Sequence, residues 1–472
     1  MGDWTYRDAA LSRRAVLGMA ATSMAALGVA ACGGSDEDGS ADTRLSVTSE
    51  GGMVAKDACL FGFPLVLMDV TRVAAEATTP PNRFRHDTSL PTPAYKEVVR
   101  PDPDTLHSTA WLDLTSEPMV LSVPMMGGGR FWLAQVLDAW TNNVHNPSSR
   151  RPQAKSAVPP YTYVVTGPGW AGPLPDDLTP LPVPTPTVWL IVRIQVDGDD
   201  DLPIVRSLQQ GLKLVPLSVW KAGEQPAPAV PPNGQANAQR PVDQVMGMDA
   251  RAFFDRMCAV MSINPPAPED EPAMRRFATI GIRPGGAVEG VSEEELTAAV
   301  ETVERQLPVT LGPNTINDNG WVADFGAGRF GTDYLLRAVT AYGALGIPLS
   351  ADAHYLFTAV PAGSGPFRLH FTPGELPPVD AFWSLAVYDA ADYLVANPAE
   401  IYSVGHHVPV VLNPDGSLDL TLQHDDPGPS VPKGNWLPIP ASDPFSATLA
   451  LFAPKEAVLQ RRWQPPPLIA LR

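Results

Sequence analysis

The sequence predicts a mainly β protein with flanking helices, in which two β domains are joined by a helical connector. Prolines and glycines number 53 and 38 among 472 residues, and they interrupt the chain too often for a helical bundle. Between them lie short runs of β-branched and aromatic residues separated by turn clusters, the pattern of a sandwich or barrel. A chain of this length exceeds what one hydrophobic core usually organises, so we expect two domains.

The first residues are typical of an export signal. Arg13 and Arg14 form a pair of the twin-arginine kind, and an apolar run rich in Ala and Gly follows up to residue 31. This run is too short to span a bilayer as a stable helix. It ends in Val29-Ala30-Ala31-Cys32, which resembles a lipobox, so we expect cleavage before Cys32 and lipidation of that cysteine. An ordinary cleaved signal with an incidental cysteine is the alternative.

Residues 32–50 are predicted to form a flexible tether, because they are mostly polar and cannot bury enough apolar surface to offset their ordering entropy. We therefore expect a protein of the cell envelope, outside the cytoplasm, anchored to the membrane by its N-terminal lipid. The net charge of −18 excludes a nucleic-acid partner and leaves a glycan or small molecule as ligand. A homo-oligomer is compatible with the sequence. Cys59 and Cys258 are expected as buried free thiols, with a disulfide bridge between them as the alternative.

The N-terminal β domain is expected over residues 51–215 and begins with an amphipathic helix over residues 48–77, kinked at Pro64. Alternating apolar runs predict strands at residues 109–114, 119–123, 131–137, 161–165 and 187–196. A proline-rich helical connector over residues 216–308 contains candidate helices at 242–263 and 292–306, the second with a capping box from Ser292 to Glu295.

The C-terminal β domain is expected over residues 309–472. It begins with a helix at residues 332–345, and a strong turn at Asn413-Pro414-Asp415-Gly416-Ser417 separates two of its strands. Alternating runs predict strands at residues 367–371, 381–388, 408–412, 418–423 and 447–452.

Two long motifs resemble known families. Val98-Val99-Arg100-Pro101-Asp102-Pro103-Asp104-Thr105-Leu106-His107, followed by Trp111-Leu112-Asp113-Leu114, is similar to the domain-of-unknown-function family 1254, and residues 130–131, 137–142 and 167–170 continue that pattern. The C-terminal part resembles the partner family, number 1214, in residues 377–385, 388–389, 413–417 and 435–438.

The resemblance implies an immunoglobulin-like sandwich followed by a jelly-roll-like one, in exported or envelope proteins with no settled activity or assigned catalytic residues. This sequence departs from the pattern Pro-Asn-x-Asp-Thr-Leu-Tyr of the first family by carrying Asp102 and His107. The departure puts any polar role shared by those two positions in doubt.

Carboxylates gather in the same stretch. Asp102, Asp104 and Asp138 are candidate catalytic residues, because glycosidic acid/base chemistry needs two carboxyl groups with different pKa values. The alternative is that Asp102 and Asp104 cap turns beside Pro101 and Pro103, as Asp often does.

Candidate ligand-binding residues are polar or aromatic side chains near strands and turns: His107, Arg130, Trp140, Trp383 and Trp436. His86, His107 and His145 could hold a metal ion, but their spacing matches no metal motif, so we predict neither a metal site nor a cofactor.

Two further motifs are weak. Residues 326–331 have the letters of a dinucleotide fingerprint, with Asp352 downstream, but no alternation of strand and helix follows. Ser384 lies in an alternating strand rather than in a nucleophile elbow.

Two hypotheses follow. The first is a binding or structural module with a pocket between its two β domains. The alternative is a hydrolase that acts on a glycan or lipid-like substrate through Asp102, Asp104 and Asp138, which requires two of them to face one cleft at about 5–10 Å.

Overall fold

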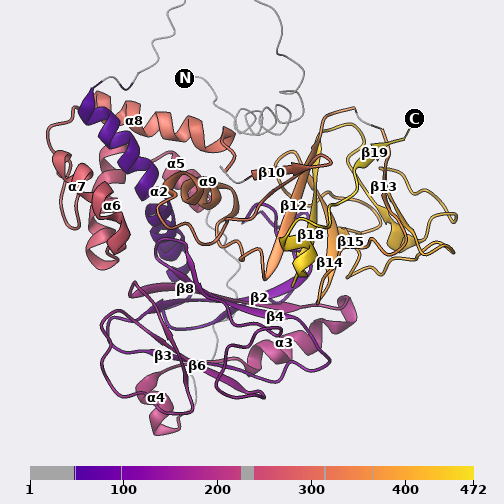
Figure 1. Ribbon diagram of the computed structural model, residues 1–472, viewed down its shortest axis with the longest axis horizontal. Helices are drawn as coiled ribbons and strands as arrows, with labels where there is room; N and C mark the ends of the chain where they lie inside the picture. The colour runs from indigo at the N-terminus through magenta and orange to yellow at the C-terminus, as the bar shows by residue number, and fades with distance from the viewer. Residues whose placement is uncertain are drawn as a thin grey trace, which may run out of the picture.

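The computed structural model describes residues 47, 49–96, 98–224, 239–312, 315–363 and 365–471. Figure 1 shows three bodies: a β-sandwich at the bottom, a second sandwich at the upper right and a group of helices at the upper left. The predicted fold class, two sandwich domains with a helical part, is confirmed. Arg13, Arg14 and Cys32, on which the export and lipidation predictions depend, lie outside the described residues.

The N-terminal sandwich consists of two sheets with strand orders β1-β2-β8-β4-β5 and β7-β6-β3-β9. The first sheet contains β1 (Arg85–His86), β2 (Thr105–Asp113), β8 (Thr187–Gln195), β4 (Trp132–Asp138) and β5 (Asn143–His145), and the second contains β7 (Thr179–Pro182), β6 (Tyr161–Thr166), β3 (Met119–Val123) and β9 (Lys213–Pro216). Helices α3 (Leu202–Gly211) and α4 (Leu217–Ala222) flank it.

Side-chain alternation gives the first sheet two distinct faces. Leu112, Val188 and Val192 point into the core of the sandwich, together with the inward residues of β3 and β6. Their sequence neighbours point away from that core, toward the C-terminal sandwich. The outward face of β2 and β8 therefore has to be covered by another part of the molecule.

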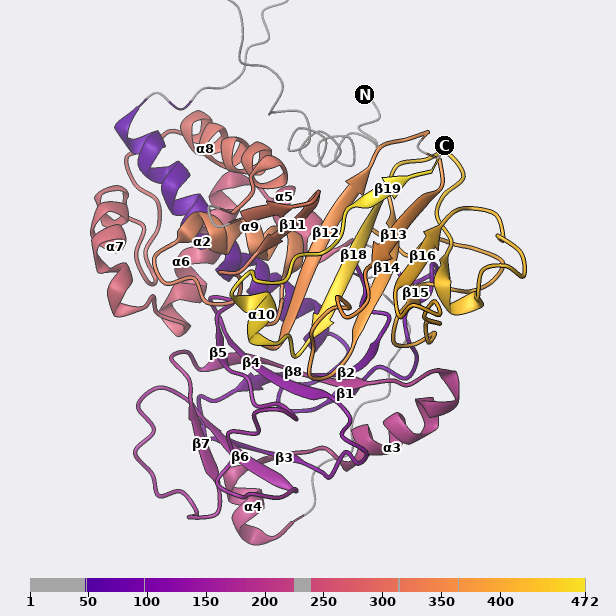
Figure 2. The same cartoon turned by 45° about the vertical axis from the view of Figure 1, so that its right-hand side comes forward.

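The C-terminal sandwich also has two sheets, with orders β10-β11-β12-β18-β14-β15 and β17-β16-β13-β19. The first contains β10 (Thr315–Asp318), β11 (Trp321–Asp324), β12 (Ala353–Val360), β18 (Phe445–Phe452), β14 (Trp383–Asp389) and β15 (Ser403–Val404), and the second contains β17 (Trp436–Leu437), β16 (Leu418–Leu422), β13 (Phe367–Phe371) and β19 (Leu468–Ala470). Helix α10 (Glu456–Leu459) lies beside them (Figure 2).

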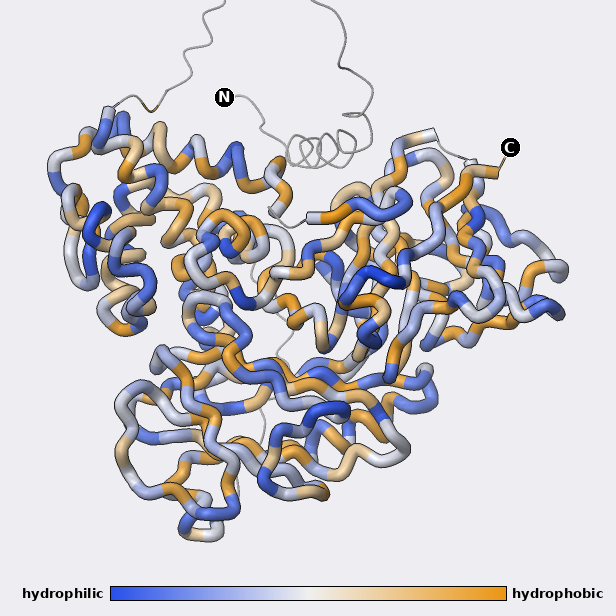
Figure 3. The backbone as a smooth tube through the Cα atoms, viewed as in Figure 1, coloured by the Kyte–Doolittle hydropathy of each residue, from blue (hydrophilic) through white to orange (hydrophobic). Residues whose placement is uncertain are grey.

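This domain repeats the two-faced pattern. Leu356, Leu385 and Leu449 enter the core between its sheets, whereas the alternate residues of β12, β14 and β18 face the N-terminal sandwich. Figure 3 shows apolar and polar residues alternating along strands of both domains. Phe131 of the first domain packs edge-on against Phe382 and Phe452 of the second, which joins the two bodies at one end.

The helical body is organised around α2 (Glu50–Glu76), which packs against α5 (Pro241–Met246), α6 (Ala250–Ile263), α8 (Glu293–Gln306) and α9 (Tyr334–Ala344), with α7 (Glu271–Phe277) nearby. Ser49 caps α2 by accepting a hydrogen bond from the Gly52 amide, and Pro64 lies inside the helix. The sequence assigned this helix to the N-terminal sandwich. Instead it shares a hydrophobic core with the connector helices, because its buried residues extend around most of its circumference.

Within the described part of the chain, α2 is the one helix with the length and apolar composition of a membrane span. Most of its apolar stretch is buried against neighbouring helices, and a core helix passes the same test of length and composition.

Several strands match their predicted ranges, including β3 and β13 at both ends. The strand predicted at residues 408–412 is wrong, because Pro409 interrupts it and the backbone of Val411 hydrogen-bonds the Asn435 side chain instead of a strand. The predicted helix 242–263 divides into α5 and α6, since Asp249 starts a new helix by capping the Ala252 amide.

The structure also decides three minor predictions. Cys59 and Cys258 are buried free thiols, as expected. The strands β11 and β12, on either side of α9, pair in antiparallel fashion, so residues 326–331 do not open a dinucleotide-binding unit. Asp352 accepts hydrogen bonds from Asn146 and Arg151 in a buried link between the domains.

Candidate functional site

A cavity of about 1470 Å³ lies where the three bodies meet. Its walls are the outward face of β2 and β8, the outward faces of β12, β14 and β18, and parts of α2 and α9. This volume exceeds the roughly 300–1,000 Å³ of ordinary small-molecule pockets. The cavity therefore has room for a ligand larger than a drug-sized molecule.

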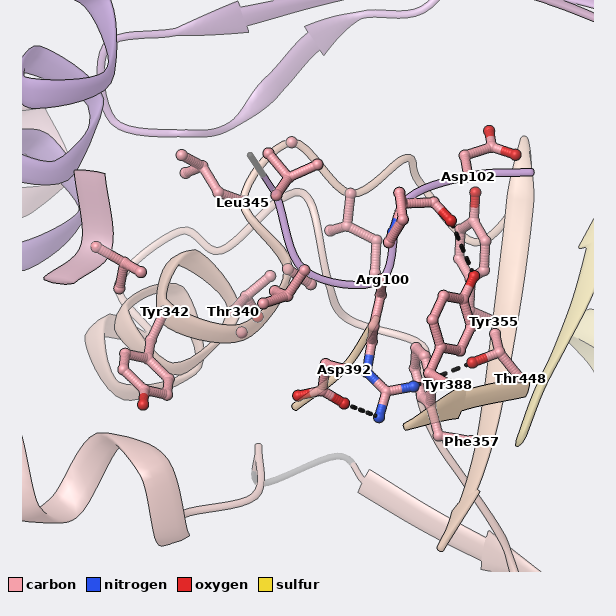
Figure 4. A pocket seen from close by; sticks show the side chains of 18 of the residues that line it. Arg100, Asp102, Thr340, Tyr342, Leu345, Tyr355, Phe357, Tyr388, Asp392 and Thr448 are labelled. Atoms are coloured by element: carbon pink, nitrogen blue, oxygen red, sulfur yellow. Dashed lines mark hydrogen bonds and ion pairs between the residues drawn. The ribbon is translucent and has the colours of Figure 1, made fainter. Parts of the chain in front are cut away.

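Aromatic and aliphatic side chains make most of the cavity wall. Trp111 on β2 and Trp189 on β8 are cross-strand partners whose rings stack with centroids 5.2 Å apart. Ile191 follows on the same face of β8, and Leu345 and Tyr342 approach from the helical side (Figure 4).

Asp102 organises the turn that enters β2. Its Oδ1 accepts a hydrogen bond of 2.8 Å from the Asp104 amide, and its Oδ2 accepts one of 2.6 Å from the Thr105 hydroxyl. These are the contacts of an Asx turn beside proline, the structural alternative considered above. Asp102 also lines the cavity, so it has more than a capping role.

Two strand residues surround the Asp102 carboxylate. Arg193 on β8 places its Nη1 3.4 Å from Asp102 Oδ2, and the Nε2 of His107 on β2 lies at the same distance from that oxygen. Burial raises the pKa of Asp102, but the hydrogen bond and charge of His107 and the charge of Arg193 outweigh it and lower the pKa to about 2. Asp102 is therefore ionised over the physiological range.

The Nε2 atom of His107 faces both Arg193 and Asp102. Arg193 Nη1 lies 2.7 Å from His107 Nε2, and a guanidinium can only donate. In the neutral ring Nε2 accepts from Arg193 and the hydrogen lies on Nδ1, whereas in the protonated ring Nε2–H faces the Asp102 carboxylate and Nδ1 also carries a hydrogen. The other Arg193 nitrogens are occupied, since Nε donates to Gln135 Oε1 at 2.8 Å and Nη2 donates to the Gly346 carbonyl at 3.4 Å.

Asp104 links the two sandwich domains. Its carboxylate accepts hydrogen bonds from Ser384 on β14 at 2.5 Å and from Ser403 on β15 at 3.2 Å, and the residue is 1% exposed. Burial and the neighbouring Asp102 charge raise the pKa of Asp104 to about 7, although both serines act in the opposite direction. Ser384 is thus a partner of a buried carboxyl rather than a nucleophile beside a base.

Arg100 approaches the opposite wall of the cavity (Figure 4). Its guanidinium forms a 2.7 Å ion pair with Asp392 and donates to Thr448 at 3.1 Å and Ser446 at 3.0 Å on β18. The ring of Phe357 lies 5.0 Å from the guanidinium carbon. The positive φ of 49° at Arg100 turns the chain so that its side chain reaches these residues.

Two tyrosines that the sequence did not single out complete the polar part of the wall. Tyr388 on β14 donates to the Pro101 carbonyl at 3.0 Å. Tyr355 on β12 lines the cavity and stands near Asp102 in Figure 4, and its hydroxyl takes part in none of the side-chain hydrogen bonds found among the described residues. Burial, the largest influence, raises the pKa of Tyr355, so its hydroxyl is a permanent donor.

Other candidate residues lie outside the cavity. Asp138 ends β4 and accepts hydrogen bonds from the Trp140 amide and from both the amide and side chain of Asn142. Trp140 packs against Phe61 in the helical core. Arg130 forms a bidentate ion pair with Asp201 next to α3. The structure therefore separates Asp138 from Asp102 and Asp104.

The two C-terminal tryptophans also pack elsewhere. Trp383 lies against Phe371, and Trp436 donates its indole N–H to the Gln423 carbonyl at 2.9 Å within the core of the C-terminal sandwich. Of the residues proposed from sequence, Asp102, Asp104 and His107 line the cavity.

The histidines considered for a metal do not meet. His86 contacts the Ser108 hydroxyl at 2.8 Å, and His145 contacts the Pro182 carbonyl at 2.7 Å. Across the described ranges, no group of three or more His, Cys, Asp or Glu side chains has an arrangement that could hold a metal ion.

In this protein two β-sandwiches and a helical body line one shared cavity. Family models match the chain twice, as "Protein of unknown function (DUF1254)" over residues 81–216 and "Protein of unknown function (DUF1214)" over residues 359–456. The chain thus carries one domain of each family, in the order expected from its motifs. The first match spans the strands of the N-terminal sandwich, and the second covers the strands from β13 to β18 of the C-terminal sandwich.

Similar chains occur among solved structures. The VPA0106 protein from Vibrio parahaemolyticus has a TM-score of 0.64 at 20% identity, covering 89% of this chain and 100% of its own. A putative uncharacterized protein from Burkholderia cenocepacia has a TM-score of 0.42 at 12% identity, covering 83% and 84%. The first similarity supports the fold alone. No curated protein matches the chain significantly.

Proposed function

We propose that this protein is an envelope-anchored ligand-binding module that holds an elongated, mainly apolar molecule in the cavity between its two β domains. The observation that carries the proposal is the cavity of about 1470 Å³, to which both sandwiches and the helical body contribute. Ligands commonly bind in concave, mostly apolar sites between domains, because such sites remove much of the ligand surface from water. A ligand here would contact all three bodies.

The composition of the wall favours a lipid-like small molecule over a glycan. Glycan sites need many hydrogen-bonding groups and exposed aromatic platforms. Here the tryptophans proposed for that purpose, Trp140, Trp383 and Trp436, pack in protein cores. The stacked pair Trp111 and Trp189 instead presents apolar surface beside Ile191.

The geometry gives less support to a hydrolase. Asp104 is covered by Ser384 and Ser403, and Asp102 is paired with Arg193. Asp138 belongs to a separate turn, so no second free carboxylate faces Asp102 across the cavity in the proposed set. Acid/base work on a glycosidic bond needs such a pair.

Gly343 offers a direct test of ligand binding. It lies in α9, lines the cavity, and a Cβ at this position would meet no atom within 4 Å. Gly343→Phe should fill part of the cavity without a clash and with improved helix propensity. We expect it to weaken binding of the uncharged apolar fluorophore N-phenylnaphthylamine by at least about tenfold, measured by fluorescence titration.

Gly343→Ala is the matched control, since it adds one methyl group and should bind like the wild type. Thermal unfolding should show both variants at least as stable as the parent, because glycine inside a helix costs about 0.5–1 kcal/mol relative to alanine. Absence of probe binding to the wild type, or equal binding by the Phe variant, would contradict the proposed function.

The export part of the proposal depends on sequence. Arg13 and Arg14 support a twin-arginine route, and Cys32 after a small-residue run supports lipidation. Several acyl chains would be needed for stable anchoring, as one chain holds a protein only marginally. Arg13→Lys with Arg14→Lys should leave the precursor in the cytoplasm, and Cys32→Ala should release the protein from membranes in cell fractionation. An unchanged location of both variants would refute this part.

A further inference from the structure

We infer that the cavity selects an uncharged ligand: a long apolar molecule that ends in a hydroxyl or carbonyl oxygen, such as a long-chain alcohol or ester, in preference to a fatty acid. The inference rests on the proposed binding function and specifies the ligand class. It follows because the arginines of the cavity wall are already paired with acidic side chains.

The arginines of the wall already have acidic partners. Arg193 faces Asp102 at 3.4 Å, and Arg100 pairs with Asp392 at 2.7 Å. Near the rim, Arg85 lies 3.5 Å from Asp87. The remaining basic side chains among the described lining residues are also engaged: Arg240 with Asp243, and Lys96 over the Tyr393 ring.

The acidic residues balance this set. Asp324 and Asp389 also line the cavity, and each accepts backbone amide hydrogen bonds, from Gly326 and from Ala391 and Tyr393 respectively. The described lining thus contains five basic residues (Arg85, Lys96, Arg100, Arg193, Arg240) and six acidic ones (Asp87, Asp102, Asp104, Asp324, Asp389, Asp392), so it has no excess of basic residues.

Among the described lining residues, an anionic ligand would meet no arginine without an acidic partner. Moving an ion out of water into apolar surroundings is costly unless a partner compensates it. A carboxylate placed near Arg193 would also approach Asp102, which is ionised and buried. An uncharged polar end avoids both penalties.

Hydrogen-bonding groups for such an end remain available. The Tyr355 hydroxyl takes part in none of the side-chain hydrogen bonds found among the described residues, and Nδ1–H of His107 is a second donor in both protonation states of the ring described above. Both side chains belong to the outward faces of their strands. Tyr355 stands near Asp102 (Figure 4), and His107 Nε2 lies 3.4 Å from Asp102 Oδ2. A ligand oxygen here could accept from Tyr355, while its apolar chain extends along Ile191 and Leu345.

Two ligands with identical tails test the inference. Dodecanol and dodecanoate should be compared by displacement of N-phenylnaphthylamine near neutral pH, and we expect dodecanol to bind at least about tenfold more tightly. Tyr355→Phe should weaken dodecanol by about three- to tenfold, as one neutral hydrogen bond is lost. Tyr163→Phe is its control, because that hydroxyl donates to the Pro152 carbonyl and the ring lies in the core of the N-terminal sandwich, outside the cavity wall.

Asp102→Asn gives the sharper result. It preserves the shape of the side chain but leaves Arg193 without its counter-charge, so dodecanoate binding should improve by at least about tenfold. Asp392→Asn should do the same through Arg100 if the first variant folds poorly. Tighter or equal binding of dodecanoate by the wild type, or no gain in either variant, overturns the inference. Binding of the probe but of neither dodecyl ligand would also overturn it, whereas failure of the probe itself counts against the proposed function.

Discussion

Asp102 and Asp138 are both buried carboxylates at ends of strands in the same N-terminal sheet, and each has an arginine in its surroundings. Arg193 lies 3.4 Å from Asp102, and burial of Asp102 is outweighed by His107 and Arg193, so its pKa falls. Asp138 accepts hydrogen bonds from Trp140 and Asn142, and burial dominates, so its pKa is raised.

The difference shows what separates a cavity group from a structural one. Asp138 satisfies the amides of its own turn, and the arginine near it, Arg337, is 2% exposed inside the helical core. Asp102 satisfies its turn as well, but its charge also fixes Arg193 on a wall that a ligand can reach. The local sequence places both residues in turns. Only Asp102 can act on a ligand, because its partner Arg193 lies on the cavity face of β8.

The largest expected effect is at Asp138. Asp138→Ala leaves the Trp140 amide, the Asn142 amide and the Asn142 side chain without their acceptor in a buried turn. Each unsatisfied buried group costs about 1–3 kcal/mol, so the free energy of unfolding should fall by about 4 kcal/mol. Urea denaturation followed by tryptophan fluorescence measures this loss.

Because Asp138 does not line the cavity, the folded fraction of this variant should bind N-phenylnaphthylamine with the wild-type affinity. Asp138→Asn, which retains one acceptor oxygen, should lose much less stability. A stability loss below about 1 kcal/mol for the Ala variant, or a changed probe affinity at full folding, would break the distinction between the two carboxylates.

A smaller effect is expected at Asp104, which lies between the two domains. Its pKa of about 7 in the folded protein is above the ordinary 3.8, so the unfolded chain releases the proton first. Stability should therefore fall by up to about 1.4 kcal/mol per pH unit as pH rises from about 4 to about 7, and stay level above that range. The pKa of Asp102 is about 2, so titration of Asp102 changes the stability only below this pH range.

Asp104→Asn should remove this decrease. Its unfolding free energy relative to the wild type should improve steadily between about pH 4 and pH 7 in urea titrations. The exposed Asp200→Asn is the control and should run parallel to the wild type. Parallel curves for Asp104→Asn as well would mean that the carboxyl group does not retain its proton between the domains.

Much of the architecture was predictable because alternation along a strand is a local property. β3 and β13 begin and end where their apolar runs do. The strand β12 was missed although its residues alternate between buried and half-buried positions from Ala353 to Val360. The helix 242–263 was predicted as continuous because the cap at Asp249 depends on where the chain turns to pack against α2.

Only the site residues that lie close together in the sequence could be predicted. Asp102, Asp104 and His107 are close in sequence, so one motif contained them. Arg193 and Tyr355 come from strands far along the chain, and only the assembled sheets bring them near Asp102. A signal for Arg193 existed, since it is a lone charge between Val192 and Ile194 in an otherwise apolar strand, and such a charge requires a buried partner.

The smallest effect should occur at Trp436, which sequence placed among the ligand-binding residues. Its indole donates to the Gln423 carbonyl and its ring lies in the C-terminal core, away from the cavity. Trp436→Phe removes one hydrogen bond and should lower the free energy of unfolding by about 1 kcal/mol, measured in urea. Probe affinity should stay unchanged, because Trp436 is not among the residues that line the cavity. A loss of probe binding equal to that of Gly343→Phe would contradict this prediction. It would show that binding also depends on the core of the C-terminal sandwich.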